Sequence, residues 1–246
     1  MLATIAAIGA DARIADWHYI FTENDSEDET VAILTAFDAQ HQRGIVESGP
    51  SLLKIHPKRT ARIALQRNRI IHHLLHDPRF TEADFLVMMD FDEVNADLAA
   101  EDVITRVAQE KREWDALFAN QLPFYYDIWA LRHPTWCPED CIAQIRNRPF
   151  WMRRETAKQK FVRNRQITLD PASPLIPVES AFGGLGIYDL RLVRQVGQEV
   201  GEAYCGLDGK GHEICDHVSF HTALRKAGGR LFIDPALINR RSVMTR

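Results

Sequence analysis

Two aspartates that lie one residue apart, Asp90 and Asp92, are the clearest candidates for chemistry in this sequence. Carboxylates so close together repel each other unless a cation or hydrogen-bond donors offset their charge. Mg²⁺ or Mn²⁺ is often held by one or two carboxylates together with phosphate oxygens of a substrate. The pair therefore predicts a metal site for a substrate with a diphosphate group. An ordinary acidic junction between a strand and a loop is the alternative for an isolated Asp-x-Asp pattern.

A second group of titratable side chains lies near the C-terminus. Glu213, Asp216 and His217 come at the expected start of a helix. His221 follows His217 by four residues, so both imidazoles lie on one helix face. Carboxylate and imidazole groups can accept a proton or bind a metal ion. We therefore expect a catalytic or metal-binding role here.

Two further stretches have an unusual composition. Residues 124–130 are densely aromatic and contain Asp127 and Trp129, which is typical either of a core segment or of the wall of a sugar-binding site. Residues 141–166 hold eight basic residues and a single acidic one. This basic stretch predicts either a solvated face or a contact with an anion or a membrane surface.

The candidates need a scaffold that brings distant stretches together, and the apolar pattern predicts alternating strands and helices. Residues 85–89 form an apolar run without alternation, which is typical of a strand buried on both faces. In an open α/β sheet, ligands bind beyond the carboxyl ends of the strands, where Asp90 and Asp92 fall. The alternation favours a three-layer α/β/α fold with a mostly parallel central sheet. Helices are expected at 2–15, 31–42, 59–75, 100–113, 190–200 and 215–227, and strands at 17–22, 51–55, 85–89, 116–120 and 230–234.

Length and composition exclude several classes of protein. A chain of 246 residues, 46% of them hydrophobic, can bury a core within one domain. Its formal net charge of -4 argues against a general nucleic-acid-binding protein. No apolar run reaches the length of about 18 residues that a membrane-spanning helix needs. The four cysteines do not make a disulfide framework, and Cys137 and Cys141 lack the second close pair of a zinc site, so we expect a reduced, cytoplasmic protein.

Five stretches carry a family resemblance by their type and order. They are the acidic loop that begins at Glu23, the pair Arg67-Asn68, Asp90-Phe91-Asp92, Gly183-Gly184-Leu185-Gly186 and Cys215-Asp216-His217-Val218. Taken in order, they resemble motifs of the nucleotide-sugar-dependent glycosyltransferases with the GT-A fold, and the resemblance covers nearly the whole chain. Residues 125–132 and 215–221 most resemble, within that fold, the fungal capsule-associated (alpha-1,3-)mannosyltransferases and their bacterial counterparts. The resemblance implies one GT-A domain at 1–246, with a nucleotide-binding half at 1–120 and a half for the donor sugar and acceptor at 121–246.

The resemblance also implies an activity. This is the metal-dependent transfer of a hexose, with mannose as one candidate, from a GDP- or UDP-sugar to a glycan or lipid-linked acceptor. Asp90 and Asp92 are expected to hold Mn²⁺ or Mg²⁺. A lipid-linked acceptor would bring the chain to the inner face of the membrane, with 141–166 as the contact. The residues expected at the donor are Glu23, Arg67, Asn68, Asp127, Trp129, Gly183 and Gly184.

Three features depart from the family's pattern. The aspartate expected as the base in inverting relatives is His217 here, so the base is His217, Asp216, or neither if the enzyme retains configuration. Many relatives use a histidine near the C-terminus as a third metal ligand, but no histidine follows His221. Asn239 is a weak substitute, and His217 or His221 could fill that role. The chain begins at what resembles the first helix of the fold, so we expect the first strand of the sheet to be missing.

Three other functions are consistent with these residues. A nucleotidyltransferase also combines a parallel sheet with carboxylate-bound Mg²⁺, but the sequence shows no basic, glycine-rich phosphate loop near its N-terminus. A non-catalytic carbohydrate-binding or scaffold protein would keep the fold without turnover. A metal-dependent hydrolase would release free sugar with no acceptor present.

Overall fold

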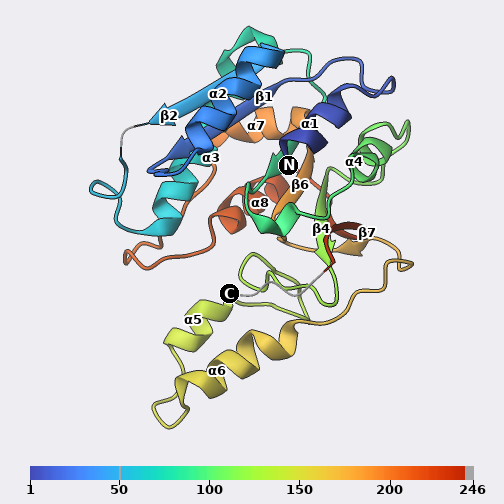
Figure 1. Ribbon diagram of the computed structural model, residues 1–246. Coiled ribbons are helices and arrows are strands. Elements are labelled where there is room, and N and C mark those ends of the chain that lie inside the picture. The colour runs from blue at the N-terminus through green and yellow to red at the C-terminus, as the bar shows by residue number, and fades with distance from the viewer. Residues whose placement is uncertain (50, 242–246) are drawn as a thin grey trace.

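The computed structural model describes residues 1–49 and 51–241, and within these residues the architecture is mixed α/β (Figure 1). The main sheet has the strand order β3, β6, β4, β7, β5. A separate parallel sheet pairs β1 (Tyr19–Asn24) with β2 (Gly44–Gly49). The strands of the main sheet are β3 (Phe85–Met89), β4 (Ala116–Gln121), β5 (Ile176–Pro177), β6 (Leu185–Asp189) and β7 (Leu231–Arg240).

The prediction of a mostly parallel central sheet is wrong. β6 runs antiparallel to both of its neighbours, β3 and β4, and β5 runs antiparallel to β7, which leaves β4 and β7 as the parallel pair of the described main sheet. Sequence analysis misses β6 because it begins inside a glycine-rich segment that is typical of a loop, although all its residues are buried. The carboxyl ends of β3, β4 and β7 nevertheless lie at one edge, since β3 and β4 are both antiparallel to β6.

The helices connect the two sheets. α3 contacts β1 and also packs against α7 and α8, which lie on the main sheet's side of the molecule, while α1 contacts α4 and α2 contacts β2. This makes α3 the element shared by both sheets. The helices are α1 (Leu2–Gly9), α2 (Thr30–His41), α3 (Arg59–His76), α4 (Ala100–Val107), α5 (Cys141–Arg146), α6 (Arg154–Phe161), α7 (Leu190–Val200) and α8 (Asp216–Lys226).

Most predicted elements are present, some with different ends. β3 and α7 have the predicted bounds, α3 and β4 differ from the prediction by one residue at one end, and α8 differs by one residue at each end. The helices predicted at 2–15 and 100–113 end earlier, at Gly9 and Val107. The first helix ends where the ring of Trp17 packs against Gly9. A Cβ on Gly9 would lie 2.3 Å from that ring, so a larger residue would not fit at this position.

The strand predicted at 51–55 is wrong, and β2 lies at 44–49 instead. Gly44 pairs with Tyr19 at the start of the parallel ladder, where a Cβ would lie 2.1 Å from the Tyr19 carbonyl oxygen. Residues 51–55 form turns in which the N–H groups of Ile55 and His56 both donate to the carbonyl of Leu52, at 3.1 and 2.7 Å. Of the apolar residues in this run, Leu52 is buried, whereas Leu53 and Ile55 are exposed.

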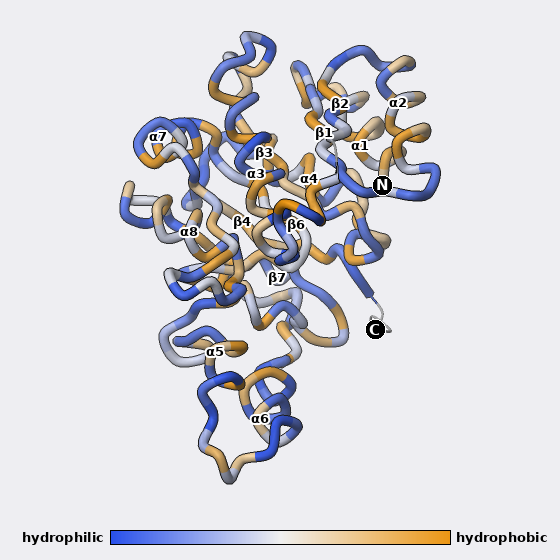
Figure 2. Tube along the Cα trace, turned by 90° about the vertical axis from the view of Figure 1, so that its left-hand side faces the viewer, coloured by the Kyte–Doolittle hydropathy of each residue, from blue (hydrophilic) through white to orange (hydrophobic). Residues whose placement is uncertain are grey.

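The hydrophobic core lies mainly between the main sheet and the helices α3, α7 and α8, and includes Ile71, Phe118, Tyr188, Val196 and Phe220. The β1–β2 sheet and the α5–α6 pair lie at opposite ends of the molecule in two views at right angles (Figures 1 and 2). Among the described residues, no helix has the length and apolar character needed to cross a membrane.

Candidate functional site

Arg67 on α3 joins three elements through ion pairs. Its Nη2 donates to Oδ1 of Asp90 at 2.7 Å, just after β3, and its Nη1 donates to Oδ2 of Asp216 at the start of α8. Its guanidinium carbon also lies 5.0 Å from the centre of the Phe182 ring. Burial opposes the charge of Arg67, but the carboxylates of Asp216 and Asp90 outweigh it and raise the pKa of the guanidinium. The predicted donor residue and two predicted acids are thus in direct contact.

Asp90 and Asp92 each keep one carboxylate oxygen without a hydrogen bond in the described structure. Oδ1 of Asp90 accepts from Arg67, and Oδ1 of Asp92 accepts from the Val94 N–H at 3.0 Å. Although the Asp90 side chain is 39% exposed, surrounding protein atoms raise its pKa, an effect that Arg67 opposes and Asp92 adds to. Two hard oxygens with open neighbouring positions suit Mg²⁺ or Mn²⁺, so the donor set fits the expected metal.

The glycine-rich segment lies directly beside Asp90. The Asp90 N–H donates to the Gly184 carbonyl at 2.9 Å. Gly183 and Gly184 have φ of 65° and 88°, which other residues rarely adopt, and a Cβ on Gly184 would lie 2.3 Å from Val94. The two glycines therefore let their segment turn and bring its backbone into hydrogen-bonding contact with the backbone of Asp90.

Asp127 contacts this segment as well. Its Oδ2 accepts from the Gly183 N–H at 3.0 Å and its Oδ1 from the Ala130 N–H at 3.3 Å. Burial raises the pKa of the Asp127 carboxyl, the two N–H donors oppose this, and the nearby Asp90 adds to it. The structure thus places Asp127 within the cluster, next to the expected donor site.

A chain of buried amides holds these parts together, and sequence analysis does not identify it. Nε2 of Gln121 donates to Oδ1 of Asn239 at 2.8 Å, and Nδ2 of Asn239 donates to Oδ1 of Asn95 at 2.7 Å. Nδ2 of Asn95 then donates to the carbonyls of Asp90 and Gly184, both at 2.8 Å. The available signal is Asn and Gln in strands β4 and β7, where such residues are depleted unless they have partners.

His217 is buried without a hydrogen-bond partner for either ring nitrogen in the described structure. Its ring stacks on Phe182, with the ring centres 3.7 Å apart. Burial lowers its pKa well below the ordinary value, and the positive charge of Arg67 and the nearby His221 add to this effect. His217 is therefore a neutral imidazole next to the Arg67 cluster, with a lone pair that no protein donor uses.

His221 has a different environment. It is fully buried, and its ring nitrogens lie 2.8 Å from the Ser180 hydroxyl and 3.0 Å from the Tyr188 hydroxyl. Burial, reinforced by the charge of Arg67, lowers its pKa to about 3. The structure gives His221 a place in the core, where neither nitrogen is available to a metal ion.

The remaining predicted residues lie at the border of the cluster. Asn68 exchanges two hydrogen bonds of 2.9 Å with the backbone of Tyr204, which fastens the loop before α8 to α3. Glu23, at the carboxyl end of β1, accepts from the Ser48 hydroxyl on β2. Trp129 donates from Nε1 to Asp140 at 3.3 Å, so its polar atom is directed to the N-terminus of α5.

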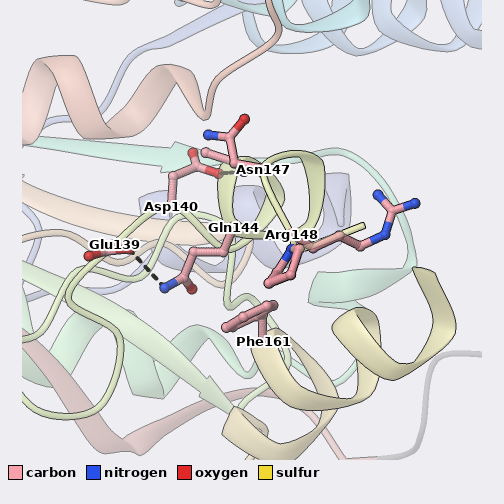
Figure 3. A pocket seen from close by; sticks show the side chains of 8 residues that line it. Glu139, Asp140, Gln144, Asn147, Arg148 and Phe161 are labelled. Atoms are coloured by element: carbon pink, nitrogen blue, oxygen red, sulfur yellow. Dashed lines mark hydrogen bonds between the residues drawn. The ribbon is translucent and has the colours of Figure 1, made fainter. Parts of the chain in front are cut away.

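A pocket of about 280 Å³ lies apart from this cluster, between α5 and α6 (Figure 3). Its walls combine acidic, amide, basic and aromatic side chains, and Gln144 donates to Glu139 across one side at 2.8 Å. None of the predicted site residues lines it. Within the described residues no group of three or more His, Cys, Asp or Glu side chains is placed so that it could hold a metal ion. The lining residues are Glu139, Asp140, Ala143, Gln144, Asn147, Arg148, Pro149 and Phe161.

The sequence matches no family model, and no curated protein matches it either. The geometry around Arg67 is therefore the basis for a functional assignment.

Proposed function

We propose that this chain is a metal-dependent glycosyltransferase of the GT-A type that transfers a hexose from a nucleotide-diphosphate sugar to a glycan or lipid-linked acceptor. The observation that carries the proposal is the convergence on Arg67. Residues from four separate stretches of the chain, all expected at one site from their types and order, are linked through direct contacts that include Asp90, Asp127, Gly183 and Asp216.

Asp90 and Asp92 would hold Mn²⁺ or Mg²⁺ through their free oxygens. When bound, such an ion neutralises a diphosphate and stabilises the negative charge that develops on it as a leaving group. With two protein ligands, the other positions are left to phosphate oxygens and water, which is the usual arrangement for Mg²⁺ at phosphate sites. The Asp-x-Asp motif therefore serves as the anchor for the donor's diphosphate.

The chain's own residues position the donor and move the proton. Arg67 fixes the Asp90 carboxylate by its ion pair, and the Gly184 carbonyl fixes the Asp90 backbone by accepting its N–H. His217 is our candidate for the base in an inverting reaction, because its ring is neutral and its lone pair is unused, whereas Oδ2 of Asp216 is held by Arg67.

One observation favours a second function. Arg67 already pairs with Asp90 and Asp216, and Asp127 already accepts two backbone N–H groups, so these acids are stabilised without a ligand. A carbohydrate-binding or scaffold protein that retains the fold without turnover would need only these internal contacts, and no metal ion to stabilise the acids. It would bind the donor but transfer no sugar.

The test is calorimetric titration of the purified protein with GDP and with UDP, each with and without Mn²⁺. We expect one nucleotide to bind only when the metal is present, and binding to weaken by about tenfold or more in Asp92→Asn, which removes a charge while keeping the shape. Glu110→Gln is the matched control. Glu110 is an exposed acid that follows the end of α4 and has no hydrogen-bond or ion-pair partner in the described structure.

The outcomes separate the candidate functions. Failure of a folded protein to bind either nucleotide, or full metal-dependent binding by Asp92→Asn, would contradict a metal site at the Asp-x-Asp motif. Binding without transfer to any acceptor and without hydrolysis would favour the scaffold function. Release of pyrophosphate from a nucleoside triphosphate would instead assign a nucleotidyltransferase.

A further inference from the structure

The loop that joins α5 to α6 exposes two adjacent aromatic side chains. Phe150 is 100% exposed and Trp151 is 69% exposed. Both views place α5 and α6 at the end of the molecule that lies opposite β1 and β2 (Figures 1 and 2). Large apolar rings are costly to hydrate, and two neighbours without cover at one extremity point to a surface that meets an apolar phase.

Basic residues close to these rings in the sequence form no ion pair within the described structure. Arg153 is the last residue of the loop and Arg154 the first of α6; both are exposed and form no ion pair within the described structure. Lys160 on α6 is also exposed and contacts the Phe161 ring, 5.3 Å from its centre, rather than a carboxylate. Glu155, the single acid of this stretch, is already paired with Lys158 at 2.9 Å. The loop and the start of α6 therefore present free positive charge beside the aromatic pair.

Hydrogen bonds from Arg148 and Met152 fix the conformation of the loop. Arg148 donates from Nη1 to the carbonyl of Ile145 at 3.0 Å and from Nε to the carbonyl of Met152 at 3.1 Å. The Met152 N–H donates to the Pro149 carbonyl at 2.9 Å. These hydrogen bonds join residues on either side of Phe150 and Trp151, so the two exposed rings lie on a turn of fixed conformation.

We propose that residues 147–154 form a membrane-docking loop, in which Phe150 and Trp151 enter the headgroup region of a bilayer and Arg153 and Arg154 contact anionic lipid phosphates. Exposed aromatic rings next to cations are the combination that binds an anionic membrane interface, where rings bury apolar area and cations meet a negative surface potential.

Charge complementarity also sets the orientation. Residues 141–166 carry eight basic residues and one acid, whereas the whole chain has a net charge of -4, so the rest of the chain is acidic overall. An anionic surface attracts the loop and repels the remainder within about a Debye length. The molecule therefore meets the bilayer by the α5–α6 end, independently of the reaction proposed above.

The test is flotation of the full chain with vesicles of pure phosphatidylcholine and with vesicles that contain about 30% phosphatidylglycerol. We expect binding to the anionic vesicles, weaker binding to the neutral ones, and a decrease when NaCl is raised. Phe150→Ser/Trp151→Ser should weaken binding by about tenfold or more. Arg153→Gln/Arg154→Gln should weaken it by roughly fivefold for each charge removed.

Matched controls change the same chemistry elsewhere on the surface. Ile33→Ser/Val200→Ser removes two exposed apolar residues, 50% and 51% exposed, from α2 and α7. Lys210→Gln/Lys226→Gln removes two exposed cations outside the loop. Both control variants should bind vesicles as the unchanged protein does. Circular dichroism and thermal melting verify that every variant is folded.

A spectroscopic readout locates the inserted residue. Brominated lipids should quench tryptophan emission in the unchanged protein, and Trp151→Phe, which keeps an aromatic ring, should bind vesicles but lose the quenching. The proposal is overturned if the folded protein does not bind anionic vesicles, if the aromatic double variant binds as tightly as the unchanged protein, or if single-stranded RNA binds to the loop in preference to vesicles.

Discussion

At the scale of single residues, the two histidines of α8 show how position decides chemistry. His217 and His221 share a helix face, yet His221 has hydroxyl partners at both nitrogens and His217 has none. Both have lowered pKa values, because burial disfavours the charged ring and the positive charge of Arg67 disfavours it further. In both cases the cost of a buried charge keeps the imidazole neutral.

His221 should make folding stability depend on pH. The unfolded chain protonates its imidazole near pH 6.5, whereas the folded protein does so only at about pH 3, so the unfolded state binds more protons between these values. The free energy of unfolding therefore falls on acidification from pH 6.5, by about 1.4 kcal/mol per pH unit from this residue. Urea unfolding at several pH values between 7.5 and about 5 measures it.

His221→Gln removes the titrating group while keeping a polar side chain, so the pH slope of this variant should be shallower by that amount. Gln40→Ala, which changes an exposed residue of α2 without a titratable group, is the control and should keep the slope of the unchanged protein. Asp90 and Asp127 have raised pKa values and act in the opposite direction, but they are present in every variant. Equal slopes in His221→Gln and the unchanged protein would show that His221 is not buried as a neutral ring.

At the scale of elements, Arg67 connects α3 to the end of β3 and to the start of α8. Arg67→Met would leave Asp90 and Asp216 without their counter-charge, and breaking a buried ion pair on one side costs about 3–5 kcal/mol. We expect a loss of stability of that size by urea unfolding. Arg67→Lys keeps the charge but offers a single ammonium group, so it should recover part of the loss.

Two comparisons make the Arg67 result specific. Arg62→Met, also on α3, breaks hydrogen bonds to the carbonyls of His56 and Pro57 and should cost about 1 kcal/mol. Adding Asp216→Asn to Arg67→Met removes one of the stranded charges and should restore stability. If Arg67→Met and Arg62→Met cost the same, the ion pairs do not hold the three elements together.

Local pattern predicts elements well where one physical signal dominates. The uniform apolar run of β3 and the amphipathic period of α7 give the correct bounds. β6 and the 44–49 strand are missed because their residues are specified by pairing partners far away in the chain, such as Tyr19 opposite Gly44. Burial of an antiparallel strand behind a glycine turn is likewise a tertiary effect, since the strand propensity of Ile187 and Tyr188 is offset by Gly186 and Asp189 within five residues.

The candidate site is predictable in part for the same reason. Asp90, Arg67 and Asp216 are recognisable by type and order, and the structure brings them into contact. The sequence cannot reveal that Phe182 lies beneath Arg67, nor that His221 turns away to two hydroxyl groups, because both depend on side-chain packing. Whether Asp92 binds a metal stays a prediction until the titration is done.

At the scale of the whole molecule, stability should be unequal between the two sheets. β1 and β2 form a two-stranded sheet, which is marginal by itself, whereas all six residues of β4 are buried between β6 and β7. We expect backbone amides of β1 and β2 to exchange with deuterium about tenfold faster or more than those of β4. Hydrogen exchange followed by mass spectrometry measures both regions in one sample.

A bound donor should change that difference. Glu23 is the penultimate residue of β1. A nucleotide bound there with Mn²⁺ should therefore slow exchange in β1 and leave β4 unchanged, since β1 carries the residue expected to contact the nucleobase and β4 does not. Equal exchange in both sheets without ligand would show that they unfold as one unit.

The amide chain from Gln121 through Asn239 to Asn95 has a direction, because Oδ1 of Asn239 and Oδ1 of Asn95 each accept from the residue before and each NH₂ group donates onward. Replacing Asn239 with Asp puts an acceptor where the NH₂ group donated, so the onward hydrogen bond is lost and two acceptors face each other. Evolution could alter such a chain only by changing neighbouring members together. Among homologues, these three positions should therefore covary as a set. A change at one of them alone should mark proteins in which the Gly183–Gly184 turn no longer has the same role.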